Sequence, residues 1–146
     1  MLSTPGGSEE SGYAIYDAIR MAKHDVGIVG IGSVQSIGAL IMQAGTIRIL
    51  TPECRFMIHN GSLEIPGGIG ADTLVAIGKE VERGNNRYHR ILAERSGLNV
   101  DKVRALCMEE TYLDAQETVL HGFADCVGKY EGGVLMATDL KKKGKK

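Results

Sequence analysis

Residues 30–45 read GIGSVQSIGALIMQAG and contain a change from strand to helix. The segment continues an apolar, partly β-branched strand predicted over residues 26–31 and leads into an apolar helix predicted over residues 36–44. Two serines, Ser33 and Ser36, lie at the junction. A hydroxyl at such a turn either caps the helix or acts as a nucleophile that a substrate can reach. Ser36, at the first turn of the helix, is the stronger nucleophile candidate.

Strands and helices alternate along the remainder of the chain. Acidic residues in first turns, glycines after last turns and one capping box mark the ends of the helices. This alternation predicts one α/β domain with a mainly parallel sheet. Helices are predicted over residues 8–23, 71–96, 99–107 and 114–122, strands over residues 47–50, 55–59 and 123–127, and a glycine-rich loop over residues 61–70. The buried side of the longest helix is predicted to include Leu74, Ile77, Val81, Tyr88, Ile91 and Leu92.

Length and charge are those of an ordinary globular protein. A chain of 146 residues can bury about two-thirds of its unfolded surface in one domain. A net charge of −1 gives no reason to expect nucleic acid or an anionic membrane as a partner. Five lysines among residues 141–146 predict a solvated end, and we expect residues 131–146 to form a disordered basic tail.

The cysteines and the apolar runs indicate the compartment. Cys54, Cys107 and Cys126 are widely spaced and include no CxxC pair, which favours buried reduced thiols over a disulfide framework or a zinc site. The first residues lack the basic and apolar regions of a secretory signal, and no apolar run approaches the ~20 residues of a membrane span. These features predict a soluble cytoplasmic protein without a metal.

Three segments carry candidate functional residues, and each has a structural alternative. The amides of Pro5-Gly6-Gly7, before a helix, could bind an anion, although such sequences also form ordinary turns. His59 ends an apolar strand, where a histidine is either structural or a base. With Ser36 these elements are what acyl transfer requires, but a carboxylate to orient the histidine is missing. The remaining histidines, His24, His89 and His121, are predicted to lie at the surface.

Four segments resemble successive blocks of the proteolytic subunits of Clp proteases. The resemblance covers about residues 2–127 and implies a crotonase-like α/β fold. The predicted helix over residues 71–96 would be the handle helix that packs two seven-membered rings face to face. The four blocks are TPGGSEESGYAIYDAIR at residues 4–20, GIGSVQSIGALIMQAG at residues 30–45, ECRFMIHN at residues 53–60 and ETYLDAQETVLHGFAD at residues 110–125.

The same resemblance implies a role for each matching site residue. Ser36 matches the family nucleophile, and His59 matches the general base. The backbone amides of Gly7 and Ile37 match the oxyanion hole. The expected activity is therefore that of a serine-type endopeptidase that cleaves unfolded proteins or short peptides through an acyl-enzyme.

The third catalytic position departs from the family pattern. Glu110 falls where the family has the aspartate that orients the histidine, and the Glu-Thr-aromatic sequence resembles phage-encoded members. Asp114 is the alternative, although its capping box with Glu117 already explains it. Glu109 replaces an arginine that helps to lock the two rings of the family together, so a weaker double ring is expected.

The start of the chain also departs from the family. The resemblance implies that the sequence begins at the strand end just before the Pro-Gly-Gly segment, and the family's N-terminal loops, first helix and first strands have no counterpart in it. Those loops contact the unfoldase and line the axial pore. We expect residues 1–130 to be a peptidase domain that is either a fragment of a longer product or a reduced form without the gate.

The resemblance implies partners and leaves two alternatives open. It implies a homo-oligomer, a heptameric ring or double ring, that works with an ATP-driven AAA+ unfoldase and needs no cofactor. The chain itself contains no GxxxxGK[ST] loop for ATP. One alternative is a non-catalytic structural ring subunit. The other is a crotonase-like acyl-CoA enzyme, which shares the fold but would leave Ser36 and His59 unexplained.

Overall fold

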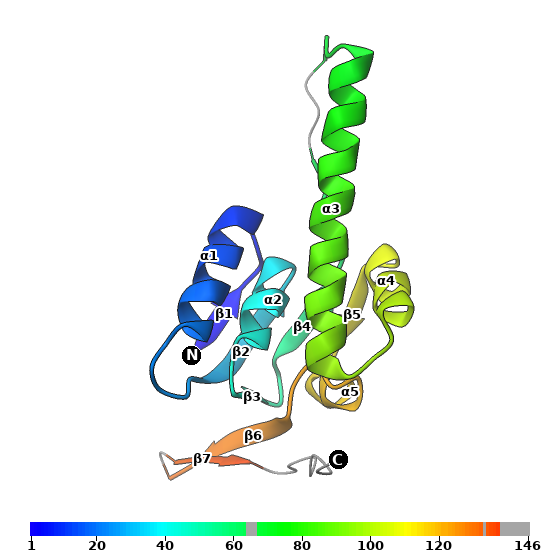
Figure 1. The fold of residues 1–146 in the computed structure, drawn as a ribbon. Helices are drawn as coiled ribbons and strands as arrows, with labels where there is room; N and C mark the ends of the chain where they lie inside the picture. Colours follow the sequence, from blue (N-terminus) through cyan, green and yellow to red (C-terminus); the bar gives the residue numbers. More distant parts are fainter. Residues whose placement is uncertain (64–66, 133, 138–146) are drawn as a thin grey trace.

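The computed structural model describes residues 1–63, 67–132 and 134–137. Helices pack on a curled sheet, and one long helix protrudes from the body of the molecule (Figure 1). The sheet has the strand order β5-β4-β2-β3-β6-β7, with β1 also paired to β2. Pairs that involve β1, β2 and β3 are parallel, which confirms the predicted α/β fold with a mainly parallel sheet. The strands are β1 (Leu2–Thr4), β2 (Gly27–Gln35), β3 (Ile47–Leu50), β4 (Arg55–Ile58), β5 (Thr111–Leu113), β6 (Cys126–Glu131) and β7 (Val134–Ala137).

The central strand β2 changes partners along its length. Its first half pairs with β3, from Gly27 opposite Ile47 onward, and its second half pairs with β4, ending with Gln35 opposite Met57. Because β2 and β4 are parallel, their carboxyl ends lie side by side at one edge of the sheet. Residues that directly follow these two strands are therefore brought together, as is usual for sites in open α/β sheets.

Five helices are described, and the most buried of them follows β2. All seven residues of α2 (Ile37–Gln43) are buried, which explains its almost wholly apolar sequence. It packs between α1 (Glu9–Arg20) and the base of α3 (Ala71–Ser96). The last two are α4 (Val100–Met108) and α5 (Ala115–Leu120). Among the described residues no helix is long and apolar enough to cross a membrane.

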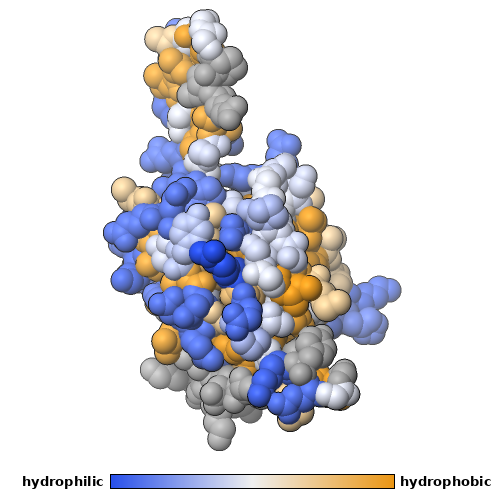
Figure 2. All heavy atoms as spheres, turned by 180° about the vertical axis from the view of Figure 1, so that it is seen from behind, coloured by the Kyte–Doolittle hydropathy of each residue, from blue (hydrophilic) through white to orange (hydrophobic). Residues whose placement is uncertain are grey.

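The long helix α3 has the bounds that the sequence predicts, but only its lower part is covered. Gly97 ends it in the left-handed conformation, with φ of 79°. Its buried residues all belong to the last three turns, from Tyr88 to Ala93. Leu74 and Val75, near the start, are 40% and 58% exposed. Figure 2 shows hydrophobic side chains over this protruding part of the molecule. The predicted apolar stripe is real, but one chain buries only half of it.

Two described strands, β5 and β7, are absent from the sequence-based expectation, whereas β1 is the strand end that the family resemblance implies before Pro5. β5 has only three residues, too short for a period of two to be recognised. β7 pairs with β6 as an antiparallel hairpin, so residues 134–137 form a strand where the sequence predicts a disordered tail. The lysine-rich residues 141–146 lie outside the described residues.

A buried ion pair between Arg48 and Asp125 connects the sheet to the C-terminal end of α2. The guanidinium of Arg48, only 1% exposed, donates to Asp125 Oδ1 over 2.6 Å, and its Nε donates to Asp125 Oδ2 over 3.1 Å. Arg48 also donates to the side-chain oxygen of Gln43 at the end of α2. A buried guanidinium needs this fork of acceptors, because unpaired burial of a charge is costly. The three predicted buried thiols are free and buried.

Candidate active site

Ser36 lies at the junction of β2 and α2 in a strained conformation. Its backbone has φ of 56° and ψ of −125°, a region that residues other than glycine rarely adopt. Its side chain makes no helix-capping hydrogen bond, so the capping alternative for this serine is wrong. The turn instead leaves the hydroxyl free to point away from the helix, as in strand-to-helix turns that present nucleophiles.

Tertiary hydrogen bonds hold this strained turn in place. The Ser36 amide donates to the Met57 carbonyl of β4 over 2.9 Å. The Ser36 carbonyl accepts from the Ala39 amide and from the Tyr88 hydroxyl of α3, both over 2.9 Å. Burial raises the pKa of Tyr88 well above its usual range, so this hydroxyl remains a donor. Nothing local in the sequence points to Tyr88 as part of the site, because its position also fits the apolar stripe of α3.

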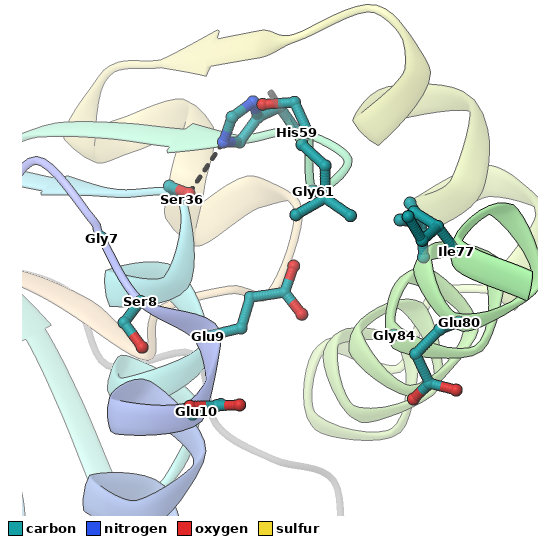
Figure 3. Close-up of a pocket in the computed structure, with 13 residues that line it drawn as sticks. Gly7, Ser8, Glu9, Glu10, Ser36, His59, Gly61, Ile77, Glu80 and Gly84 are labelled. Carbon is teal, nitrogen blue, oxygen red and sulfur yellow. Dashed lines mark hydrogen bonds between the residues drawn. The ribbon is translucent and has the colours of Figure 1, made fainter. Parts of the chain in front are cut away.

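His59, directly after β4, faces Ser36 across the edge of the sheet. Its Nε2 lies 2.7 Å from the Ser36 Oγ, as Figure 3 also shows. The contact follows from the register: Gln35, the last residue of β2, lies opposite Met57, one residue before the end of β4, so Ser36 and His59 follow the ends of adjacent strands. The following residue is fixed as well, because the Asn60 amide donates to the Cys107 carbonyl over 3.1 Å.

Glu110 approaches the other nitrogen of the same ring. Its Oε1 lies 3.3 Å from His59 Nδ1. The antiparallel pairing of β4 with β5 puts Ile58 opposite Thr111, so His59 and Glu110 extend the two strands at the same end. A carboxylate only accepts, so Nδ1 carries the proton in this contact and Nε2 is left to accept from Ser36. Glu110 also has a positive φ, 50°, and its side chain is 64% exposed.

Asp114, the alternative to Glu110, forms hydrogen bonds with Glu117 instead of His59. Its Oδ1 accepts from the Glu117 amide over 2.7 Å, and its own amide donates to the Glu117 carboxylate over 2.9 Å. This is the capping box that the sequence predicts for α5. The structure thus brings Glu110, not Asp114, to His59.

The Pro5-Gly6-Gly7 segment passes directly over Ser36. Gly6 and Gly7 have φ of 109° and 142°, which glycine adopts easily. A Cβ at Gly6 would lie 2.6 Å from the Ser36 Cβ, so no other residue fits this approach. Gly7 lies beside Ser36 in Figure 3, and Ile37 is the first residue of α2. The oxyanion-hole role of the Gly7 and Ile37 amides stays a prediction. Ser33 lies inside β2, paired with Arg55, outside this cluster.

His89 corrects a sequence-based expectation. It is predicted to be a surface residue but is only 2% exposed, at the base of α3. Its Nε2 lies 2.8 Å from the Asn60 side-chain oxygen, next to His59. Burial, with a smaller effect of Arg104, lowers the pKa of His89, so the ring is held neutral. The neighbouring Arg87 and Arg90 suggest an exposed segment in the sequence, although this turn of α3 faces the core.

A cavity of about 690 Å³ opens beside the Ser36–His59 contact. One wall is the start of α1 with Gly7, and the opposite wall is a stretch of α3 from Ile77 to Gly84. Gly61, Ser62 and Leu63 lie between these walls. The Gly61 amide donates to the Asn85 side chain over 2.8 Å, which ties this loop to α3. A substrate in the cavity would therefore contact both the paired side chains and the long helix.

Serine hydrolases use this arrangement: a serine on a strained turn forms a hydrogen bond with a histidine, and a carboxylate approaches the other ring nitrogen. The chain belongs to the Clp protease family, whose model matches residues 1–131. It is similar to the "ATP-dependent Clp protease proteolytic subunit" of Streptococcus pneumoniae strains Hungary19A-6 and CGSP14. Each is 32% identical over 126 residues, which are 85% of this chain and 64% of the relative. The chain thus spans less than two-thirds of the length of these curated relatives.

Proposed function

We propose that this chain is the peptidase subunit of a Clp-type serine endopeptidase. The observation that carries the proposal is the continuous contact from Ser36 through His59 to Glu110 beside an open cavity. Family membership supports the same reaction class. The substrates would be unfolded proteins or short peptides, because an extended chain can lie along the cavity next to the start of α1.

The proposed reaction starts with acylation of Ser36. His59 Nε2 takes the hydroxyl proton while the Ser36 Oγ attacks the peptide carbonyl carbon. The negative oxygen that forms is stabilised by the amides of Gly7 and Ile37, and Glu110 stabilises the imidazolium of His59. His59 then gives its proton to the leaving nitrogen, the C–N bond breaks, and the amine departs.

Deacylation repeats these steps with water. His59 Nε2 removes a proton from a water molecule, whose oxygen attacks the carbonyl carbon of the Ser36 ester. The tetrahedral intermediate collapses with release of the carboxylic acid, and the proton on His59 returns to the Ser36 oxygen. These steps require no metal or organic cofactor.

A fluorophosphonate probe tests this proposal against its alternatives, because the probe labels serines that an adjacent base activates. The Ser36 oxygen should displace fluoride from the phosphorus of the probe, so we expect the chain to gain the mass of one probe less HF, with the label on Ser36, and Ser36→Ala to gain none. Ser33→Ala is the matched control and should label as the unmodified chain does. A non-catalytic ring subunit or an acyl-CoA enzyme without an activated serine would leave the unmodified chain unlabelled, and that result would overturn the proposal.

Tyr88→Phe should weaken catalysis without unfolding the protein. The substitution removes only the hydroxyl that donates to the Ser36 carbonyl, so the strained turn loses one of its restraints. A lost hydrogen bond of about 1 kcal/mol corresponds to a roughly fivefold lower kcat/KM. The measurement is hydrolysis of a fluorogenic peptide, with Tyr16→Phe as the matched control. Unchanged turnover in Tyr88→Phe would show that the hydroxyl does not position Ser36.

We further propose that the chain assembles through α3 into a ring or a pair of rings and works with an AAA+ unfoldase. The exposed Leu74 and Val75 support assembly, since apolar residues on a protruding helix are typical of an interface. Free buried thiols support a reducing compartment such as the cytoplasm.

Sedimentation velocity of the purified chain should show a heptamer or a larger species. Leu74→Glu should shift the distribution to smaller species, whereas Lys79→Glu on the same helix should not. A monomer at micromolar concentration would contradict the assembly proposal.

A further inference from the structure

Two chemically different kinds of side chain line the cavity beside Ser36. Leu63, Ile77 and Val81 are apolar. Glu9, Glu10 and Glu80 add three carboxylates, and none of the described residues that line the cavity is a lysine or an arginine. Such a cavity favours a ligand that combines an aliphatic portion with a positive charge.

Glu9 is one of the carboxylates that line this space. In Figure 3 its side chain leaves the start of α1 and points across the cavity toward α3. A Cβ at Gly61 would collide with the Glu9 carboxylate, and a Cβ at Gly84 would lie 3.1 Å from Glu9 Oε2. The absence of side chains at these two glycines makes room for the carboxylate between the loop and the helix.

The Glu9 carboxylate forms no direct ion pair among the described residues, whereas Glu80 pairs with Arg83 over 3.3 Å. Arg87, on the adjacent turns of α3, stacks on the ring of Tyr13 at 3.8 Å from its centroid. Among the described residues no three carboxylate, histidine or cysteine side chains are close enough to hold a metal ion.

The proposed reaction determines which side chain of a substrate meets Glu9. In the acyl-enzyme, the residue whose carbonyl carbon is bonded to Ser36 stays attached, and its side chain needs room next to Ser36 and His59. The cavity provides that room. A leucine there would cover carboxylates and remove them from water without giving them a partner, which is unfavourable. A lysine or arginine would lay its methylenes along Ile77 and Val81 and bring its charge to Glu9.

We propose that the chain selects lysine or arginine at the residue whose carbonyl is attacked, and that Glu9 is the specificity-determining residue. This inference rests on the proposed peptidase function. An acidic side chain at the same position would be rejected by repulsion from Glu9 and Glu10.

Hydrolysis of matched peptides tests the preference. Three fluorogenic peptides would differ only in the residue before the cleaved bond, which is lysine, leucine or glutamate. We expect kcat/KM at low salt to be at least tenfold higher for lysine than for leucine, and lowest for glutamate. Glu9→Gln should reduce the lysine-to-leucine ratio at least tenfold. Glu82→Gln removes a charge from α3 outside the cavity and should leave the ratio unchanged.

A binding measurement separates this inference from the reaction itself. With Ser36→Ala, the dissociation constants of the lysine and leucine peptides can be compared by fluorescence anisotropy without turnover. Tighter binding of the lysine peptide that is lost in Ser36→Ala/Glu9→Gln supports the specificity even if hydrolysis fails. If hydrolysis depends on Ser36 but kcat/KM for the leucine peptide equals or exceeds that for the lysine peptide, the specificity proposal is wrong and the proposed peptidase function is retained. Equal binding of both peptides also overturns it.

Discussion

Ser36→Ala is expected to lower kcat for peptide hydrolysis by about 10³-fold or more, the loss usual for a triad serine. The hydroxyl is the only group in the cluster whose oxygen can form the acyl-enzyme ester, and it lies 2.7 Å from the nitrogen that would take its proton. The backbone at this position already carries a side chain at φ of 56°, so alanine introduces no additional backbone strain. Turnover of a fluorogenic peptide and the thermal midpoint of unfolding should be measured together.

Ser33→Ala is the control for this experiment. Ser33 lies in β2 opposite Arg55, so removal of its hydroxyl should leave turnover close to that of the unmodified chain. If Ser36→Ala remained active and Ser33→Ala did not, the nucleophile would have been assigned to the wrong serine. A loss of the folded state in Ser36→Ala would appear as a lower unfolding midpoint and would be distinguished from a loss of chemistry.

The elements that sequence analysis placed well are those with local signals. The bounds of α3, the stop at Gly97 and the capping box of α5 each depend on residues within one or two turns of the helix. β5 has only three residues and exists because it pairs with β4, more than 50 positions earlier in the chain. No periodicity within such a short segment can reveal a partner so distant.

Ser36 shows how tertiary contacts override a local preference. A serine before an apolar helix is a favoured cap by local statistics. In the structure, Met57 and Tyr88 hold the Ser36 backbone in a conformation where its side chain makes no capping bond. Both partners belong to other elements, so the preceding and following residues could not indicate the outcome.

Local patterns made Ser36 and His59 candidates, but only the family resemblance assigned their roles and added Glu110. Ser36 and His59 are 23 residues apart, and His59 and Glu110 are 51 apart. Their meeting depends on the parallel register of β2 with β4 and the antiparallel register of β4 with β5. The number of residues between these positions does not reveal either strand register. A family with the same fold reveals both, because its members share the strand pairing. Tyr88 had no such guide, and only its hydrogen bond to the Ser36 carbonyl singles it out.

Glu110→Gln is expected to cut turnover by orders of magnitude while the protein stays folded. The Glu110 carboxylate can only accept, so it keeps the proton on His59 Nδ1 and leaves Nε2 free to take the proton of Ser36. A glutamine can donate its amide to Nδ1 and thereby favour the tautomer with the proton on Nε2, which cannot act as the base. The neutral amide also fails to stabilise the imidazolium; a comparable acid-to-amide change in a serine protease costs about 10⁴-fold in kcat.

Two further substitutions decide whether Glu110 or Asp114 orients His59. Asp114→Asn should lower the free energy of unfolding by only about a few tenths of a kcal/mol, because asparagine caps a helix about as well as aspartate, and it should leave turnover nearly normal. Glu110→Asp should retain activity, since it keeps a carboxylate and since aspartate tolerates the positive φ of 50° at this position better than most residues. Steady-state hydrolysis of one fluorogenic peptide by the three variants is sufficient. An inactive Asp114→Asn beside a nearly normal Glu110→Gln would transfer the orienting role to Asp114. The capping box would then have to open for catalysis, because both Asp114 hydrogen bonds to Glu117 occupy that end of α5.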